Sequence, residues 1–101
     1  MVTVDEKDCW EALKGVMDPE LGINIVDLGL VYEIVIEGGE VCVVMTLTTP
    51  GCPLSGSLPK AALNAVAVVP GVMGADVVLT FDPPWSPQKI SPAGRQVLAG
   101  N

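Results

Sequence analysis

The sequence predicts an α+β fold: a two-layer α/β sandwich in which helices pack on one face of a three-stranded mixed sheet. Two observations carry this prediction. An apolar hairpin fills much of the first half of the chain, and amphipathic helical patterns stand before and after it, the second followed by one more strand. The expected order is helix–strand–strand–helix–strand, with a short helix at the end. With 101 residues, half of them hydrophobic, the chain suits a single domain spanning residues 1–101.

The first helix is expected over residues 4–16. Thr3 and Glu6 fit a capping box at its start, and Asp18-Pro19 ends it, because the residue before proline avoids the helical region. Residues 19–29 are apolar without a clean period and predict a partly buried connection. The apolar face of the helix has three- and four-residue steps and comprises Cys9, Trp10, Leu13, Val16 and Met17.

The hairpin is expected to turn at Gly38-Gly39, since both positions of a type I′ turn need positive φ. Folding there sets Glu37 opposite Glu40 and predicts an apolar face on which Ile36 pairs with Val41, Ile34 with Val43, Tyr32 with Met45 and Leu30 with Leu47. The same register places Gly29 near Thr48 and Leu28 near Thr49. The opposite face is half apolar and suggests a dimer or a partner; with the third strand it carries Val31, Val35, Cys42, Val44 and Val78 among acids.

In the second half, a helix is expected from near Ser57, with Pro59 in its first turn. A start at Pro53 with a bend is the alternative, disfavoured because an interior proline costs about 3 kcal/mol. The third strand is expected over 75–81, and Ser91-Pro92 predicts the start of a last helix that runs to about residue 99. The third strand's inward side chains are expected to be Val77, Leu79 and Phe81.

Composition excludes several functions. The net charge of −7, with five scattered basic residues, argues against nucleic acid as a partner. The absence of histidine excludes Ser-His-Asp and Cys-His catalysis within one chain, as well as His-based zinc sites. Three cysteines without CxxC spacing argue against a disulfide framework. A charged start and the lack of about 18 consecutive apolar residues predict no membrane association and a cytoplasmic location.

Cys52 is the candidate functional thiol. It follows the second strand, is flanked by Pro50-Gly51 and Pro53, and precedes a helix start, where free backbone N–H groups favour a thiolate. A thiolate attacks electrophiles or binds soft metals, so Cys52 is also the candidate metal ligand. A buried thiol beside a tight turn is the competing interpretation. Cys9 and Cys42 lie on a helix core stripe and within a strand, which is typical of packing residues.

Polar residues on both sides of the hairpin are the candidate support of this thiol. Asp18, Glu20 and Asp27 precede the hairpin, and Thr48 and Thr49 follow it. A carboxylate raises the pKa of a neighbouring thiol, so these acids suit metal ligation or the orientation of a backbone loop rather than thiol activation. Capping of loop N–H groups is an equally simple role. Outside this set, Arg95 either pairs with a carboxylate or is solvated, and Trp85 covers the site or the core.

Together, "DPELGINIVDLGLVYEI", "MTLTTPGCPL" and "VVLTFDPPWSPQKIS" resemble the metal–sulfur cluster biosynthesis domain, the domain of SufT, PaaD and the MIP-eighteen protein of cytosolic iron–sulfur targeting. The resemblance covers residues 5–99. It implies a compact α/β domain related to the cluster-carrying C-terminal domain of NifU-type proteins and a role in iron–sulfur protein maturation, with Cys52 as the functional cysteine. Asp18, Glu20, Thr48 and Thr49 match positions that the family groups around it.

The resemblance implies an assembly factor rather than an enzyme. Its expected partners are iron–sulfur assembly proteins or client apoproteins, with a homodimer as a further option. A cluster generally takes four ligands, so one thiol predicts transient contact with an iron–sulfur cluster and no tightly bound cofactor. Two rivals remain. One is a PaaD-like accessory subunit of a multicomponent aromatic-ring oxygenase. The other is a thiol enzyme, against which the missing histidine counts.

Overall fold

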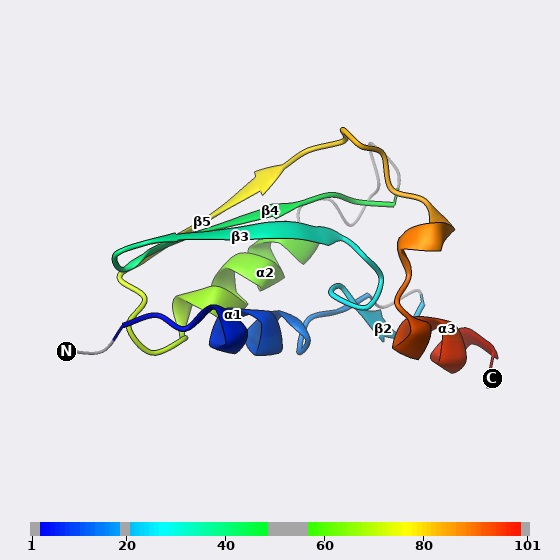
Figure 1. Ribbon diagram of the computed structural model, residues 1–101, viewed down its shortest axis with the longest axis horizontal. Coiled ribbons are helices and arrows are strands. Elements are labelled where there is room, and N and C mark those ends of the chain that lie inside the picture. Colours follow the sequence, from blue (N-terminus) through cyan, green and yellow to red (C-terminus); the bar gives the residue numbers. More distant parts are fainter. Residues whose placement is uncertain (1–2, 19–20, 49–56, 100–101) are drawn as a thin grey trace.

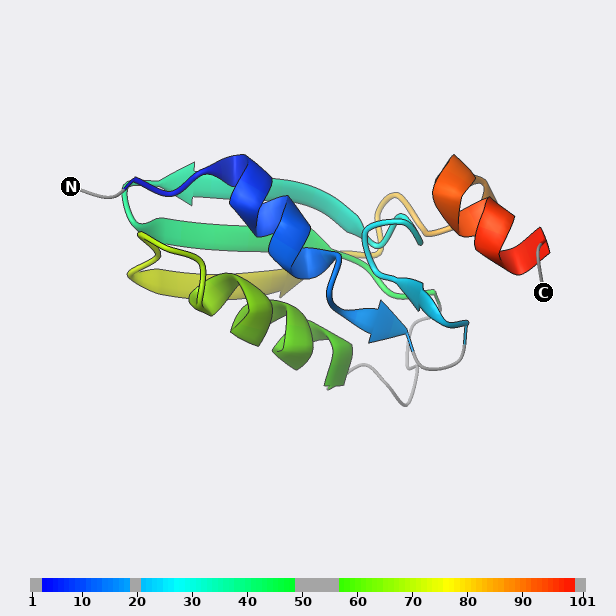
Figure 2. The ribbon, with the colours of Figure 1, turned by 90° about the horizontal axis from the view of Figure 1, so that it is seen from below.

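The computed structural model describes residues 3–18, 21–48 and 57–99, with the side chain of Ser57 left out. Strands β3 (Val31–Glu37), β4 (Glu40–Met45) and β5 (Gly74–Leu79) form a sheet in that order, in which β4 pairs antiparallel with β3 and parallel with β5. Helices α1 (Glu6–Leu13) and α2 (Ser57–Ala67) lie on the same face of this sheet (Figures 1 and 2). The predicted two-layer α+β fold with a mixed sheet is therefore confirmed.

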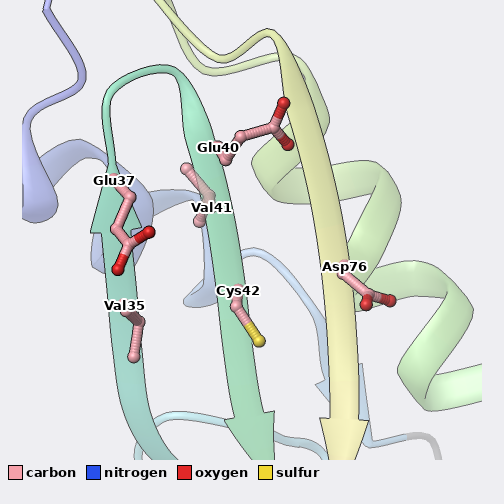
Figure 3. A pocket seen from close by; sticks show the side chains of 6 residues that line it. All are labelled: Val35, Glu37, Glu40, Val41, Cys42 and Asp76. Carbon is pink, nitrogen blue, oxygen red and sulfur yellow. The ribbon is translucent and has the colours of Figure 1, made fainter.

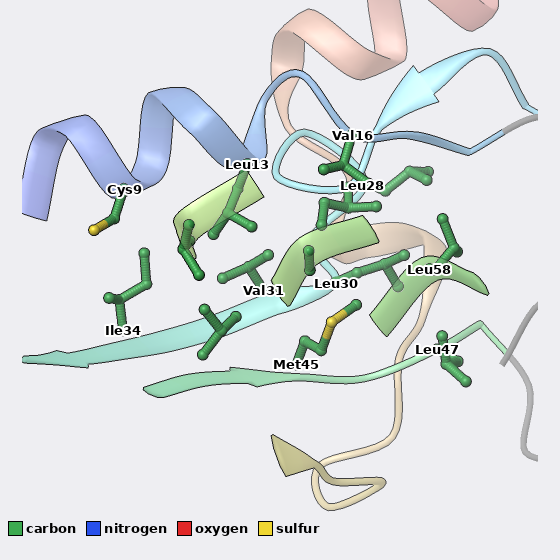
Figure 4. Close-up of a cluster of buried hydrophobic side chains, with 14 of the residues drawn as sticks. Cys9, Leu13, Val16, Leu28, Leu30, Val31, Ile34, Met45, Leu47 and Leu58 are labelled. Carbon is green, nitrogen blue, oxygen red and sulfur yellow. The ribbon is translucent and has the colours of Figure 1, made fainter. Parts of the chain in front are cut away.

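The core lies between the sheet and the two helices (Figure 4). It is aliphatic, as the small number of aromatic residues requires. Helix α1 supplies Cys9 and Leu13, α2 supplies Ala62 and Val66, and all four side chains are fully buried. The strands and the segments beside them contribute Ile23, Ile25, Leu28, Leu30, Val31, Ile34, Val41, Val43, Met45 and Leu47. Val16, Leu58, Val69 and Ile90 are also buried in it.

Helix α1 is shorter than predicted and begins differently. Its N-cap is Asp5, whose carboxylate accepts a hydrogen bond from the Lys7 N–H (2.9 Å), so the predicted Thr3–Glu6 capping box is wrong. Glu6 instead accepts a hydrogen bond from Trp10 Nε1 (3.1 Å) one turn along. The helix ends at Leu13, and Met17 is 51% exposed rather than on the apolar face. The helical period fails at Met17 because the backbone is extended there.

A small hairpin that the sequence pattern did not predict occupies part of residues 19–29. Strand β1 (Met17–Asp18) pairs antiparallel with β2 (Ile23–Asn24), and Ile25 N–H donates to the Val16 carbonyl (2.9 Å). Strands of two residues are too short to show alternation, so their sequence carries no period-two signal. This segment is more buried than a surface connection, since Ile23, Ile25 and Leu28 all enter the core.

The main hairpin keeps the predicted register from Glu37–Glu40 as far as Glu33–Val44. Its turn has positive φ at Gly38 (61°) but not at Gly39, so the type I′ assignment is wrong. A register shift between Glu33 and Val31 then pairs Val31 with Met45, which corrects the predicted Tyr32–Met45 pair. The Thr46 N–H likewise bonds the Leu30 carbonyl (2.8 Å), where Leu47 was the expected partner of Leu30.

This irregularity in β3 changes which side chains face the core. Val31, expected on the open face, is buried, whereas Tyr32 is turned out of the core and is half-buried. Its hydroxyl donates to the Pro83 carbonyl (2.7 Å), and Lys89 Nζ lies 5.2 Å from its ring centroid. An extra residue in one strand redirects the side chains beyond it, and here it aims Tyr32 at the C-terminal segment.

The second half follows the prediction in its helices but not in its last strand. The described part of α2 begins at Ser57, with Pro59 in its first turn, and the alternative start at Pro53 lies outside the described residues. Helix α3 (Pro92–Ala99) begins directly after Ser91. A 3-10 turn, η1 (Pro87–Lys89), precedes α3. Strand β5 ends at Leu79, and both Leu79 and Phe81 are more than a third exposed, so neither is buried in the core as predicted. Leu79 nevertheless lies on the same side of β5 as Val77, which packs against the core.

Among the described strands, β5 pairs with β4 alone, which leaves it at one edge of the sheet. Its Ala75 and Val77 pack against the core, and its later residues extend past it. Within the described ranges, no helix is both long and apolar enough to cross a lipid bilayer.

Candidate functional site

The candidate site lies at one end of the sheet. Cys52, Glu20 and Thr49 are outside the described residues, so the structure gives no position for these three predicted site residues. The described segments that flank them in the sequence, which are the end of β4, the first turn of α2 and the β1–β2 hairpin, lie at the same end of the molecule (Figures 1 and 2). The described members of the predicted set are Asp18, Asp27 and Thr48, and each can be placed.

Asp18 is a buried carboxylate, only 5% exposed, at the end of β1. Its Oδ1 accepts a hydrogen bond from the Leu21 N–H (3.1 Å), and its backbone carbonyl accepts one from Gly22 N–H (2.9 Å). Gly22 has positive φ (70°), which suits a tight return of the chain. Asp18 therefore takes part in fixing the turn that joins β1 to β2.

Asp27 connects the loop after β2 to the C-terminal helix. Its Oδ2 accepts a hydrogen bond from Asn24 Nδ2 (2.7 Å), and its Oδ1 accepts one from the Ser91 hydroxyl (2.9 Å). The backbone repeats both links, because Asp27 N–H donates to Asn24 Oδ1 (2.9 Å) and Ser91 N–H donates to the Asp27 carbonyl (2.7 Å). Charge-assisted bonds of this kind are stronger than neutral ones, so Asp27 holds two distant segments together.

Two further side chains of the C-terminal segment bind backbone carbonyls, Trp85 in the same loop and Arg95 within the segment itself. Trp85 Nε1 donates to the Leu28 carbonyl (2.7 Å), and its ring packs against the core, so Trp85 covers the core. Arg95 binds backbone carbonyls through Nε to Ile90 (3.1 Å) and through an Nη to Gln88 (3.2 Å) and Pro87 (3.3 Å). Among the described residues, the bonds of Arg95 go to backbone carbonyls rather than to a carboxylate, and they fix the bend between η1 and α3.

Thr48 is half-buried and follows β4 without belonging to it. Thr46, two residues earlier, is completely buried and donates to the Leu47 carbonyl (3.4 Å). Because the register shifts between Val31 and Glu33, the alignment that placed Gly29 opposite Thr48 moves by one residue. Gly29 instead lies against η1, where a Cβ at Gly29 would be 2.7 Å from the Lys89 Cβ.

The two described cysteines differ in their surroundings. Cys9 is fully buried, and burial, with smaller contributions from Asp8 and the other acids of the first turn, raises the pKa of its thiol. It is a packing residue, as the sequence predicts. Cys42 is half-buried on the open face of the sheet, in the middle of β4. Neither belongs to the end of the sheet where Thr48 and Ser57 bound the Cys52 segment.

The described carboxylates of the candidate site hold loops in place through hydrogen bonds. In residues 3–18, 21–48 and 57–99, no three Cys, Asp or Glu side chains are grouped as metal ligands. Asp18 and Asp27 instead accept hydrogen bonds from their own and neighbouring loops, which favours loop orientation over metal ligation for both. Sequence reasoning identified Asp27 and the Ser91 cap separately. It missed that they bind each other, because no local pattern links residues 64 positions apart.

Comparison with known proteins supports both fold and family. The chain matches the family described as "Iron-sulfur cluster assembly protein" over residues 6–77. It is 43% identical to the Fe-S protein maturation auxiliary factor YitW of Bacillus subtilis, over 79% of each chain. It is 40% identical to the Fe-S protein maturation auxiliary factor SufT of Staphylococcus aureus, over 75% of this chain and 88% of SufT. The crystal structure of the DUF59 domain from Bacillus anthracis is 34% identical, with a TM-score of 0.88 over 95% of this chain and 92% of that chain.

Proposed function

Because the chain belongs to the iron–sulfur cluster assembly protein family, we propose that it is an auxiliary factor in the maturation of iron–sulfur proteins. The observation that carries this proposal is its 43% and 40% identity to two maturation auxiliary factors, over most of both chains. In this role the protein meets assembly proteins or client apoproteins, and the cluster is its cargo. Cys52 is the residue that contacts the cluster or its metal, transiently.

The ligand count supports transient contact. An iron–sulfur cluster generally takes four ligands, mostly thiolates. Of the three cysteines, Cys9 is sealed in the core with a raised pKa, and Cys42 lies in the middle of the sheet. This leaves Cys52 as the thiol of the candidate site, so the remaining ligands come from a partner protein or from small thiols. The chain then passes a cluster on rather than storing it.

The described residues around Cys52 have a positioning role in this proposal. Asp18 fixes the β1–β2 turn, and Asp27 fixes the next loop to α3. Their carboxylates are engaged by N–H and O–H donors of the chain. They therefore shape the surface beside the thiol, and a carboxylate held in this way adds little to the activation of Cys52.

The test is the replacement Cys52→Ser in cells that depend on this protein. We expect the activity of an iron–sulfur client enzyme to fall toward that of cells lacking the protein, while the abundance of the variant, measured by immunoblot, stays unchanged. Cys9→Ala is the matched control, because it removes a thiol far from the candidate site. Normal client activity with Cys52→Ser would overturn the role of the thiol.

A second measurement addresses the cluster directly. Anaerobic incubation of the purified protein with iron and sulfide, together with a small thiol such as dithiothreitol, should give visible absorption that Cys52→Ser lacks and Cys9→Ala retains. A chromophore of equal intensity in all three proteins would place the cluster on other ligands.

A further inference from the structure

One face of the main sheet is uncovered in the described chain. Helices α1 and α2 pack on the opposite face, and no described helix lies on this one (Figures 1 and 2). The side chains at its centre are small and apolar, because Val35 is 39% exposed, Val78 is 45% exposed, and Cys42 and Val44 between them are half-buried. We call these four residues the open-face patch. Adjacent exposed apolar side chains from three strands favour burial by another molecule.

Carboxylates border the open-face patch. The three strands contain four acids and no Lys or Arg, and all four acids are exposed: Glu33, Glu37, Glu40 and Asp76. Strand alternation places them on the uncovered face, since Ile34, Val41 and Val43 point into the core. The salt bridge of the described residues joins Lys14 to Glu11 on α1 and involves none of them.

Three of the acids and two residues of the open-face patch, Val35 and Cys42, line a shallow pocket. Its volume is about 260 Å³, and its walls come from all three strands: Val35, Glu37, Glu40, Val41, Cys42 and Asp76. Figure 3 shows the Cys42 sulfur between β4 and β5, with Asp76 beside it and Glu37 and Glu40 toward the hairpin turn. The Glu40 carboxylate lies over Gly74, since a Cβ there would be 2.9 Å from the carboxylate carbon. The pocket therefore has an apolar floor and an acidic rim.

We propose that this face docks a partner protein whose contact surface has an apolar centre surrounded by Lys and Arg side chains. Such a surface buries the valines and supplies the cations that the four strand acids lack within the described chain. Complementary charge also raises the association rate and disfavours acidic partners. The inference rests on the proposed function in one respect, since a maturation factor must contact other proteins. Beyond that function, the inference names the face of this chain that docks the partner and the kind of side chains on the partner's contact surface.

A second copy of this chain fits the face poorly. Two such faces packed together would bring eight like charges into one interface without a strand Lys or Arg to offset them. Like charges opposed across an interface weaken binding, the more so when water is excluded. The phosphate backbone of a nucleic acid is repelled for the same reason.

The test uses a photo-crosslinking amino acid placed at Val78 or at Val35 in cells, with the crosslinked peptide identified by mass spectrometry. The control position is Val68, which is 81% exposed and follows α2 away from the sheet. We expect positions 78 and 35 to react with the same protein, through a peptide that is rich in Lys and Arg, and position 68 not to react with it.

Charge reversal then tests the chemistry of that contact. With the identified partner purified, Glu37→Lys or Asp76→Lys should weaken binding about tenfold in a calorimetric titration at low salt, and less at 0.5 M salt. Glu11→Lys, which makes the same change of charge on α1, should leave the Kd unchanged. An equal effect of all three reversals would mean that only net charge matters and would overturn the docking site.

Other outcomes are equally decisive. Crosslinks between two copies of this chain, to a protein without a basic contact surface, or to no protein would each overturn the proposal. Failure here is distinguishable from failure of the proposed function. If Cys52→Ser abolishes client activity while Glu37→Lys and Asp76→Lys leave it intact, the proposed role of Cys52 is supported and the docking face is not needed for function. If the crosslinks and the charge dependence are found as expected while Cys52→Ser is fully active, the docking face is supported and the role of Cys52 is overturned.

Discussion

Cys9 illustrates how a single side chain depends on its surroundings. It is fully buried between α1 and the sheet, and burial, followed by the carboxylates of Asp8, Glu6 and Asp5, raises the pKa of its thiol above the value near 9.0 of an unburied cysteine. The folded chain thus holds the Cys9 proton more tightly than the unfolded chain does. Its contribution to stability is complete below the unfolded pKa and is lost as the pH rises through the folded pKa.

We therefore predict that the difference in free energy of unfolding between the wild type and Cys9→Ala narrows between pH 8 and pH 11. Urea denaturation at several pH values measures it. Other groups that titrate in this range are present in both the wild type and Cys9→Ala, so their effects cancel in the difference. A difference that stays constant over the whole range would show that the Cys9 thiol titrates alike in both states.

The residue scale also shows how far a sequence pattern can be followed. Cys9 and Leu13 were predicted as core residues because their spacing matches a helix, and they are buried. Met17 continues the same spacing but is exposed, because the helix has ended at Leu13. A helical spacing of apolar residues identifies the buried face of a helix only as far as the backbone remains helical. Where a helix stops is decided by contacts, here the pairing of β1 with β2, that spacing does not encode.

At the scale of elements, Gly29 sets how closely the start of the main hairpin approaches η1. Its φ is +79°, and an added Cβ would lie 2.7 Å from the Lys89 Cβ and closer still to its carbonyl oxygen. Gly22 has a similar φ of +70°, but an added Cβ there meets nothing within 4 Å. The two glycines share a backbone requirement and differ only in packing.

We predict that Gly22→Ala costs about 1 kcal/mol through backbone strain alone, whereas Gly29→Ala costs about 1–3 kcal/mol more through the clash with η1. The free energy of unfolding in urea measures both. Equal losses for the two variants would mean that η1 shifts without cost and does not hold the hairpin.

The hairpin also separates what local sequence encodes from what it does not. Its register near the turn was predictable, because Gly38-Gly39 and the apolar alternation agree as far as Glu33. The register shift beyond Glu33 was not predictable from local sequence. Tyr32 points away from the core and contacts the Pro83 carbonyl and Lys89, which lie more than fifty residues later in the chain. The burial expected for Leu79 failed for a similar reason, because alternation gives the side of the strand on which a residue lies and not whether another element covers it there.

At the scale of the whole molecule, the C-terminal segment is attached to the loop beside the candidate site through Ser91. Its hydroxyl donates to Asp27 Oδ1 (2.9 Å) and accepts from Gly94 N–H (3.0 Å), so it caps α3 and ties it to the loop. The cap was predictable from Ser91-Pro92, and its partner was not. Gly94 permits the close approach, because a Cβ there would be 3.2 Å from the Asp27 carbonyl oxygen.

We predict that Ser91→Ala lowers the free energy of unfolding by about 1–2 kcal/mol through loss of the cap and of a charge-assisted bond. Hydrogen exchange should show weaker protection in α3 and unchanged protection in β3 and β4. Ser86→Ala is the matched control, because Ser86 precedes η1 without a side-chain cap bond. Uniform loss of protection throughout the chain would contradict a local tie.

The tie between Asp27 and Ser91 has a consequence for the order in which the chain is made. A ribosome completes the loop that contains Asn24, Asp27 and Leu28 long before it adds Trp85 and Ser91, which supply donors to that loop. A nascent chain can already contain helices α1 and α2 and all three strands of the sheet while this loop still lacks its last partners. That loop thus acquires its last hydrogen-bond partners only near the end of translation.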